Sequence, residues 1–172
     1  MALAPLPLQQ PITIIALTSS GYISGTVHLL AMKNLRTLLN AQDEILKLTH
    51  AMLPGSQQVH SFLALRKGSA LLIVPKADPE LFKPEPSSQP RAQRLVTCLL
   101  ELGSIQGYIE VPENVRTSDF LLRSPGFIEF RECYLGPNPQ LDPQEMTGDP
   151  LPVVYVNSRS MVGVTEATQP SE

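Results

Sequence analysis

The chain has 172 residues, enough for one domain or two small ones, and its 42% apolar residues are typical of a folded protein. Its 13 basic and 16 acidic residues give a net charge of −3, which argues against a protein whose main task is to neutralise a nucleic-acid backbone or an anionic membrane. Its 17 prolines are well above average usage, and they concentrate in residues 1–11, 76–90 and 136–150.

The first segment, residues 1–11, contains three prolines and no basic residue before its apolar stretch. This is not the pattern of a secretory signal, and no apolar run in the chain approaches the roughly 20 residues that span a bilayer. We therefore expect an extended leader, no membrane span and a cytoplasmic protein. Cys98 and Cys133 lie among apolar residues, where buried free thiols are expected and a disulfide is the alternative.

The sequence contains an internal repeat, in which four segments of the first half recur in order in the second. Gly21-x-Ile-x-Gly25 reappears 82 residues later as Gly103-x-Ile-x-Gly107. The last matched segment is offset by 91 residues, so the second copy has about nine extra residues in the preceding loop. Four ordered matches with small changes of offset predict a duplicated unit. The matched segments are 12–28 with 94–110, 34–37 with 114–117, 45–53 with 127–135, and 62–74 with 153–165.

Each copy has the alternation of apolar and polar residues that is typical of β-strands. Gly21 and Gly103 are expected in the turn between the first two strands, and Gly25 and Gly107 are expected at a bend within the second strand. The motif Asn-x-Arg-Thr then predicts a single helical turn in each copy, with its Asn or Thr as the cap. Tight hairpins are expected at 66–69 and 157–160.

About five short, bent strands in each copy are most economically closed as a small barrel, because closure removes exposed sheet edges. The predicted fold is mostly β, with two tandem five-stranded barrels of Sm-like or SH3-like type that pack together. The predicted divisions are a leader at 1–11, a first barrel at 12–75, a proline-rich linker at 76–93, a second barrel at 94–166 and a disordered tail at 167–172.

Four short motifs of the second copy recur together in one known family. They are Gly103 with Gly107, Arg116-Thr-Ser-Asp119-Phe-Leu, Phe127-Ile-Glu-Phe and Val154-Tyr-Val-Asn157. Through them, residues 94–166 resemble an uncharacterised bacterial domain family of unknown function. The first copy is a degenerate match, since it keeps Arg36 but lacks the Ser-Asp pair and has Arg66 in place of the Asn.

The expected strand order also looks like that of the Sm-like small barrel, whose members form RNA-binding rings. The sequence departs from that family in the shorter spacing of its glycines and in the absence of an Asp-x-φ-Asn loop. No Arg-Gly pair follows the fourth strand either. The resemblance therefore extends to the fold and not to a set of RNA-binding residues.

No catalytic or metal site is predicted, and no cofactor is expected. His28, His50 and His60 all lie in the first copy, without the spacing of a metal-binding motif. Asp119 and Glu132 with Arg116 form a possible acid and base set, but an Arg and an Asp three residues apart are far more often a cap or a salt bridge. The chain is not expected to be an enzyme.

Three functions of different classes remain. The first is a protein-interaction or scaffold subunit of a larger bacterial assembly, which binds a protein partner or itself. The second is an RNA- or DNA-binding regulator of Sm-like type that uses Arg36, Arg66 and Lys67, and the third is a sensor that binds a small molecule between the barrels. Residues 1–82 carry six basic and four acidic groups and residues 83–172 carry seven and twelve. This split favours head-to-tail contact within or between chains, and a solvated acidic surface on the second half is the alternative.

Overall fold

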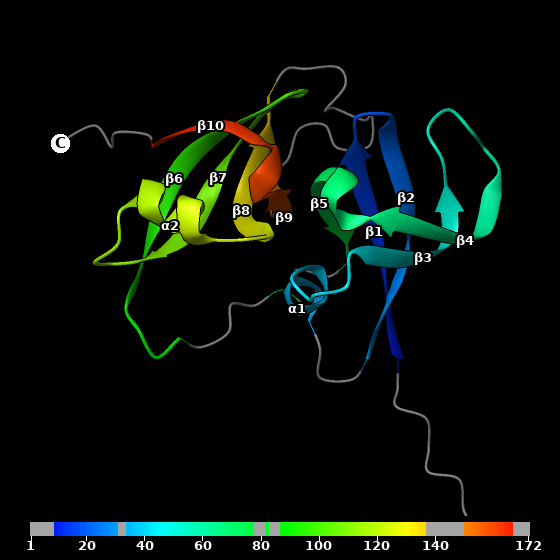
Figure 1. Cartoon of the computed structure of the whole chain (residues 1–172), viewed down its shortest axis with the longest axis horizontal. Helices are drawn as coiled ribbons and strands as arrows, with labels where there is room; N and C mark the ends of the chain where they lie inside the picture. The colour runs from blue at the N-terminus through cyan, green and yellow to red at the C-terminus, as the bar shows by residue number, and fades with distance from the viewer. Residues whose placement is uncertain (1–8, 31–33, 78–81, 83–86, 137–149, 167–172) are drawn as a thin grey trace, which may run out of the picture.

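The computed structural model describes residues 9–30, 34–77, 82, 87–136 and 150–166. In these residues ten strands form one antiparallel sheet in the order β10-β6-β7-β8-β9-β5-β1-β2-β3-β4 (Figure 1). The strands are β1 (Gln9–Thr18), β2 (Gly21–Leu30), β3 (Ile45–Met52), β4 (Val59–Arg66), β5 (Ala70–Lys76), β6 (Arg91–Leu100), β7 (Gly103–Pro112), β8 (Phe127–Leu135), β9 (Leu151–Asn157) and β10 (Met161–Glu166). The prediction of a mostly β fold is confirmed.

Short helical segments join some of these strands. They are α1 (Leu35–Leu39), α2 (Thr117–Arg123) and the 3₁₀ turns η1 (Lys67–Ser69) and η3 (Ser158–Ser160). Among the described residues, no helix has the length and apolarity that crossing a bilayer requires.

The strands begin earlier than the predicted divisions. β1 starts at Gln9, within the expected leader, and β6 starts at Arg91, within the expected linker. Residues 1–8 of the leader, much of the linker, residues 137–149 of the inserted loop and the tail at 167–172 lie outside the described residues.

The first half, β1–β5, and the second half, β6–β10, have the same internal strand order. Their registers correspond as well. Thr26 lies opposite Thr49 in the first half, and the residues 82 positions later, Tyr108 and Arg131, lie opposite each other in the second half. The register shifts where each second strand passes Gly25 or Gly107. Each half therefore bends its second strand at the glycine that the sequence pattern indicated.

The first helix begins as predicted. Asn34 caps α1, since its Oδ1 accepts a hydrogen bond of 2.7 Å from the backbone N–H of Thr37. The same prediction is wrong for α2, which follows Arg116 and has no side-chain cap. The second helix keeps the offset of 82 from the first, whereas Asn114 is offset by only 80 and so lies two residues before the capping position.

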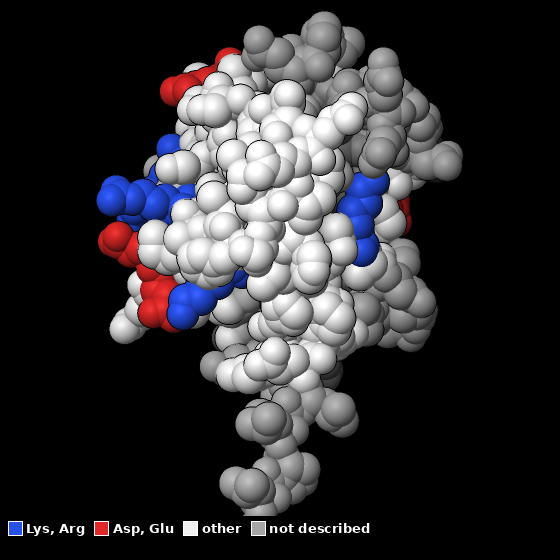
Figure 2. All heavy atoms as spheres, turned by 90° about the vertical axis from the view of Figure 1, so that its right-hand side faces the viewer, with Lys and Arg blue, Asp and Glu red and all other residues white. Residues whose placement is uncertain are grey.

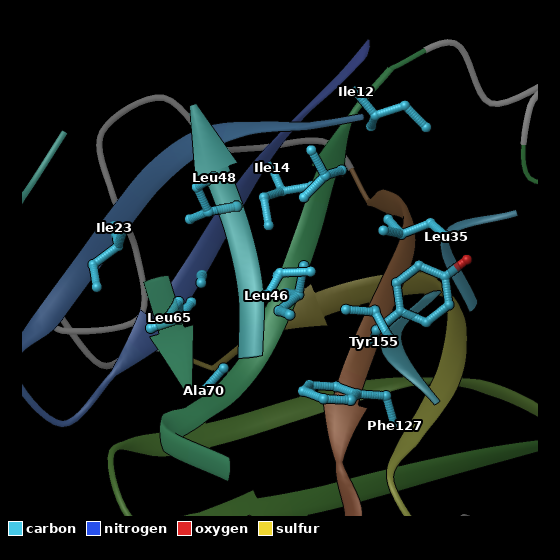
Figure 3. Packing of buried hydrophobic residues seen from close by; sticks show 14 of the residues in the cluster. Ile12, Ile14, Ile23, Leu35, Leu46, Leu48, Leu65, Ala70, Phe127 and Tyr155 are labelled. Carbon is cyan, nitrogen blue, oxygen red and sulfur yellow. The ribbon is translucent and has the colours of Figure 1, made fainter. Parts of the chain in front are cut away.

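The core has two clusters of buried side chains, and both halves contribute to each cluster. Phe127, Val153 and Tyr155 of the second half pack with the first-half core (Figure 3). In the opposite direction, Leu72 and Val74 of β5 pack with the second-half core. The two halves are therefore joined by shared side-chain packing as well as by the sheet.

Candidate interaction site

The two halves meet where β5 pairs with β9. Leu72 lies opposite Val156 and Ile73 opposite Tyr155 in antiparallel register. The four side chains are buried, with those of Leu72 and Val156 in one core cluster and those of Ile73 and Tyr155 in the other. Both strands are thus buried on both faces, whereas antiparallel strands commonly have one face in water.

Asn157 fastens the end of β9 to the first half. Its side chain is buried, and its Nδ2 donates to the carbonyl oxygen of Ala70 at 2.9 Å and to that of Lys67 at 3.5 Å. Its Oδ1 accepts from the backbone N–H of Arg159 at 3.1 Å. The predicted motif residue Asn157 therefore satisfies backbone groups on both sides of the junction.

A second amide joins the halves on the α1 side. Asn40, the residue that ends α1, donates from Nδ2 to the carbonyl oxygen of Phe127 at 3.1 Å and accepts from the N–H of Phe127 at 2.8 Å. The side chain thereby imitates a strand partner for the beginning of β8. Gly126 leaves room for it, because a Cβ at that position would overlap Asn40 Oδ1.

Lys67, predicted as a nucleic-acid contact, is buried. Its Nζ donates to the carbonyl oxygens of Leu38 at 2.6 Å and Ala41 at 3.3 Å, and so holds the end of α1. Burial lowers the pKa of Lys67, and the carboxylate of Asp43 acts in the opposite direction. The ammonium group is thus engaged within the protein.

The other two predicted nucleic-acid contacts, Arg36 and Arg66, are exposed. They border different cavities: Arg36 lines one with α2 and β8, while Arg66 lines another with η1 and Asn157. The three basic residues therefore do not gather in a single cavity among those described.

The two open edges of the sheet are β4 and β10. Within its own half, β4 corresponds to β9 of the junction, and β10 corresponds to β5. Phe62 of β4 is 57% exposed, whereas Val153, 91 residues further along in β9, is 3% exposed. Val162 of β10 is 68% exposed, whereas Leu71, its counterpart in β5, is 8% exposed. Exposed apolar side chains thus mark the two edges where their counterparts at the junction are covered.

The face of the molecule that carries β4 is turned toward the viewer in Figure 2. Where its residues are described, most of this face has neither acidic nor basic side chains. An open strand edge with exposed apolar residues and few charges lacks the features that usually keep edge strands apart. The β4 edge is therefore suited to pairing with another strand.

The glycines of the two Gly-x-Ile-x-Gly segments lie at the start of β2 and β7 and at the register shift within each of these strands. Gly21 and Gly103 begin the second strand of each half with positive φ values of 112° and 144°. A Cβ at Gly25 would lie 3.0 Å from Leu48 Cβ, and one at Gly107 would lie 3.0 Å from the Arg131 carbonyl oxygen and from Cys133 Sγ. Close packing at the bend accounts for glycine at these two positions.

The acid and base candidates do not converge. Arg116 and Asp119 are both exposed, and no salt bridge joins them among the described residues. His28 contacts Thr49 Oγ1 at 2.9 Å. Within the part of the chain that the structure describes, no three His, Cys, Asp or Glu residues are grouped so that they could hold a metal ion.

Cys98 and Cys133 are buried free thiols, as expected. Burial raises the pKa of Cys98 to about 12 and also raises that of Cys133. Thiols that keep their protons in this way are poor nucleophiles.

Sequence reasoning missed the pairing of β5 with β9. A signal was present in the uninterrupted apolar runs Ala70–Val74 and Val153–Val156, since a run without polar alternation is typical of a strand buried on both faces. Comparison with protein-family models, with curated proteins and with solved structures gives no match. The functional argument therefore rests on the chain itself.

Proposed function

We propose that the chain is a non-enzymatic scaffold subunit, made of two copies of one small five-stranded barrel unit, that associates head to tail with further copies of itself. The β4 edge of one chain would pair with the β10 edge of the next. The observation that carries the proposal is the β5–β9 junction within one chain. It pairs the last strand of one half with the fourth strand of the other, and β10 and β4 are the corresponding strands that remain open.

The equivalence defines a register for the contact between chains. At the junction Leu72 lies opposite Val156 and Ile73 opposite Tyr155. The last matched segments of the two halves are 91 residues apart. Leu72 of β5 therefore corresponds to Gly163 of β10, and Val156 of β9 corresponds to Leu65 of β4. The contact between chains would place Gly163 of one chain opposite Leu65 of another. In the same register Val164 lies opposite Ala64.

A second copy of this chain is the occupant that this surface fits best. The two open edges are different from each other, so the contact is heterologous and repeats from chain to chain, giving a closed ring or a filament according to the rotation between subunits. The basic excess of residues 1–82 and the acidic excess of residues 83–172 also favour contact between unlike ends.

Arg66 supports the same arrangement. It stands 91 residues before Asn157, the residue that fastens the internal junction, and it is exposed at the end of β4. A guanidinium group is a multiple hydrogen-bond donor, as an amide NH₂ is, so it can donate to carbonyl oxygens of a neighbouring chain. Those carbonyls would belong to Ser158 and Met161, the counterparts of Lys67 and Ala70.

Size-exclusion chromatography with light scattering tests the proposal. The wild-type protein is expected to exceed its single-chain mass of 18.8 kDa, and a variant with Phe62→Lys and Val162→Lys is expected to run at 18.8 kDa. Lysine on an edge strand opposes pairing with another strand, and Val162→Lys also places a like charge opposite Arg66 in the proposed register. Both positions are already exposed, so the fold is retained.

Tyr134→Lys is the matched control, since Tyr134 is 54% exposed on β8, which lies between β7 and β9 and at neither open edge. It should leave the wild-type mass unchanged. A wild-type protein that stays a single chain at every concentration contradicts the proposal, as does an assembly that the double variant does not weaken.

A further inference from the structure

A cavity of about 270 Å³ lies between the two halves of the chain, and it collects an unusual share of the basic residues. Four arginines line it, out of 13 lysines and arginines in the whole sequence, together with two glutamates. α1 contributes Arg36, and the other three arginines come from β6, α2 and β8.

Two of the four arginines are matched by the two glutamates. Arg91 lies 3.9 Å from Glu110, and Arg131 forms an ion pair with Glu129. Arg131 also donates to the carbonyl oxygen of Phe82. These two guanidinium groups are thus held in place by neighbours within the chain.

Arg36 and Arg123 have no such partner in the part of the chain that the structure describes. Among the described residues, neither makes a salt bridge or a side-chain hydrogen bond, although both line the cavity. One comes from each half, and each lies in the last turn of its helix. Within the described part of the chain, no acidic side chain pairs with these two positive charges.

The fold itself does not require this cluster. The first-half positions 82 residues before Arg91, Arg123 and Arg131 are held by Gln9, Ala41 and Thr49, all uncharged. At the first-half positions that correspond to Glu110 and Glu129, the chain has His28 and Lys47. Since the corresponding strands have the same register without these charges, the arginines are better explained by a ligand than by folding.

The lining favours one chemical class of ligand. Guanidinium groups that approach from several elements match a tetrahedral group with three acceptor oxygens, and a phosphate monoester is a dianion of that kind. Tyr108 and Phe120 are half-buried at the wall and offer surface on which a ring can pack. The volume lies just below the range of about 300–1,000 Å³ for ligand pockets, which suits a small molecule.

We infer that this cavity binds a small phosphate monoester whose substituent carries a ring, with Arg36 and Arg123 holding the phosphate group. The site is internal to one chain and made by both halves, so it is independent of the association of chains. Binding is therefore expected to persist in the variant with Phe62→Lys and Val162→Lys.

Isothermal titration calorimetry at fixed ionic strength tests the inference with phenyl phosphate and adenosine monophosphate as probes. At least one of them should bind saturably, and phenol and adenosine should not. The variant with Arg36→Gln and Arg123→Gln should bind at least about tenfold more weakly, because each substitution removes a charged hydrogen-bond donor. Arg116→Gln, at an exposed arginine outside the cavity, should bind as the wild type does.

Amide chemical shifts give a second readout that does not depend on the variants. On titration with the bound probe, shifts should gather at the Asn40 side-chain amide and at the backbone of Phe120 and Ser124, all of which line the cavity. The inference is overturned if neither probe binds, if phthalate binds at least as tightly as phenyl phosphate, if the double variant retains full affinity, or if the shifts lie elsewhere.

Discussion

The side-chain amide of Asn157 donates a hydrogen bond of 2.9 Å to the carbonyl oxygen of Ala70, and so ties the last residue of β9 to the first residue of β5. These two residues are 87 positions apart in the sequence. The bond lies where the two halves share one sheet, and the amide is buried. The junction is therefore a specific connection in addition to apolar packing.

Replacing Asn157 should destabilise the whole chain. Asn157→Ala leaves the buried carbonyl of Ala70 without this donor and should lower the free energy of unfolding by about 1–3 kcal/mol. Asn157→Asp should cost more, because a carboxylate accepts hydrogen bonds and would face two carbonyl oxygens. Urea denaturation measures both, with Ser158→Ala as the control at the neighbouring, partly exposed position. Equal stability of Asn157→Ala and the wild type would refute the role of this amide.

The Asn40 and Gly126 pair should behave as a coupled site. Gly126→Ala places a Cβ against Asn40 Oδ1 at a residue whose φ is +85°, and should lower the free energy of unfolding by at least about 2 kcal/mol. In an Asn40→Ala background the overlap is gone, so the same change should cost only about 1–2 kcal/mol for the left-handed backbone. A double-mutant cycle from urea unfolding measures the difference. Additive effects of the two substitutions would contradict the described geometry.

Much of the local structure could be predicted from the sequence, because turns, bends and caps depend on neighbouring residues. The turns at Gly21 and Gly103, the bends at Gly25 and Gly107 and the cap at Asn34 are examples. The cap expected at Asn114 was wrong, since a shift of two residues moved it away from the helix start. A local motif does not show that the Asn-x-Arg-Thr segment is displaced by two residues relative to the start of α2.

The sequence predicted that the two halves pack together, but not which residues of distant segments meet. The pairing of β5 with β9 joins residues more than 80 positions apart, and the arginines of the cavity come from separate elements. No spacing rule connects such residues, so their assembly follows only from the three-dimensional fold. The apolar runs at Ala70–Val74 and Val153–Val156 indicated strands covered on both faces, but not which strand covers which.

The buried thiols make stability depend on alkaline pH. Burial raises the pKa of Cys98 from 9.0 to about 12 and raises that of Cys133 in the same direction. Between these values the unfolded chain has lost thiol protons that the folded chain keeps, so the free energy of unfolding should fall as the pH rises from about 9 to about 12. Urea midpoints at several pH values measure the slope.

A variant with Cys98→Ala and Cys133→Ala provides the control for this effect. Its slope should be smaller but not zero, because burial also raises the pKa of Tyr155 and the nearby carboxylate of Glu129 adds to the effect. An unchanged slope in this variant would show that the thiols do not cause the pH dependence.

Disulfide trapping between chains tests the proposed register of assembly. Residues directly opposite each other in antiparallel strands have Cα atoms about 4.5–5.5 Å apart, within the range of a disulfide. A residue two positions further along is about 7–8 Å away, at or beyond that range. Ala64→Cys and Val164→Cys should therefore form a bond between chains, and Ala64→Cys with Val162→Cys should not. The native Cys98 and Cys133 are buried and leave little background.

The most direct measurement is oxidation of two separately purified proteins, Ala64→Cys and Val164→Cys, alone and in an equal mixture, followed by non-reducing electrophoresis. Head-to-tail association through β4 and β10 predicts a covalent dimer in the mixture and none in either protein alone. A dimer that forms equally well from one protein alone, or no dimer in the mixture, would contradict the account.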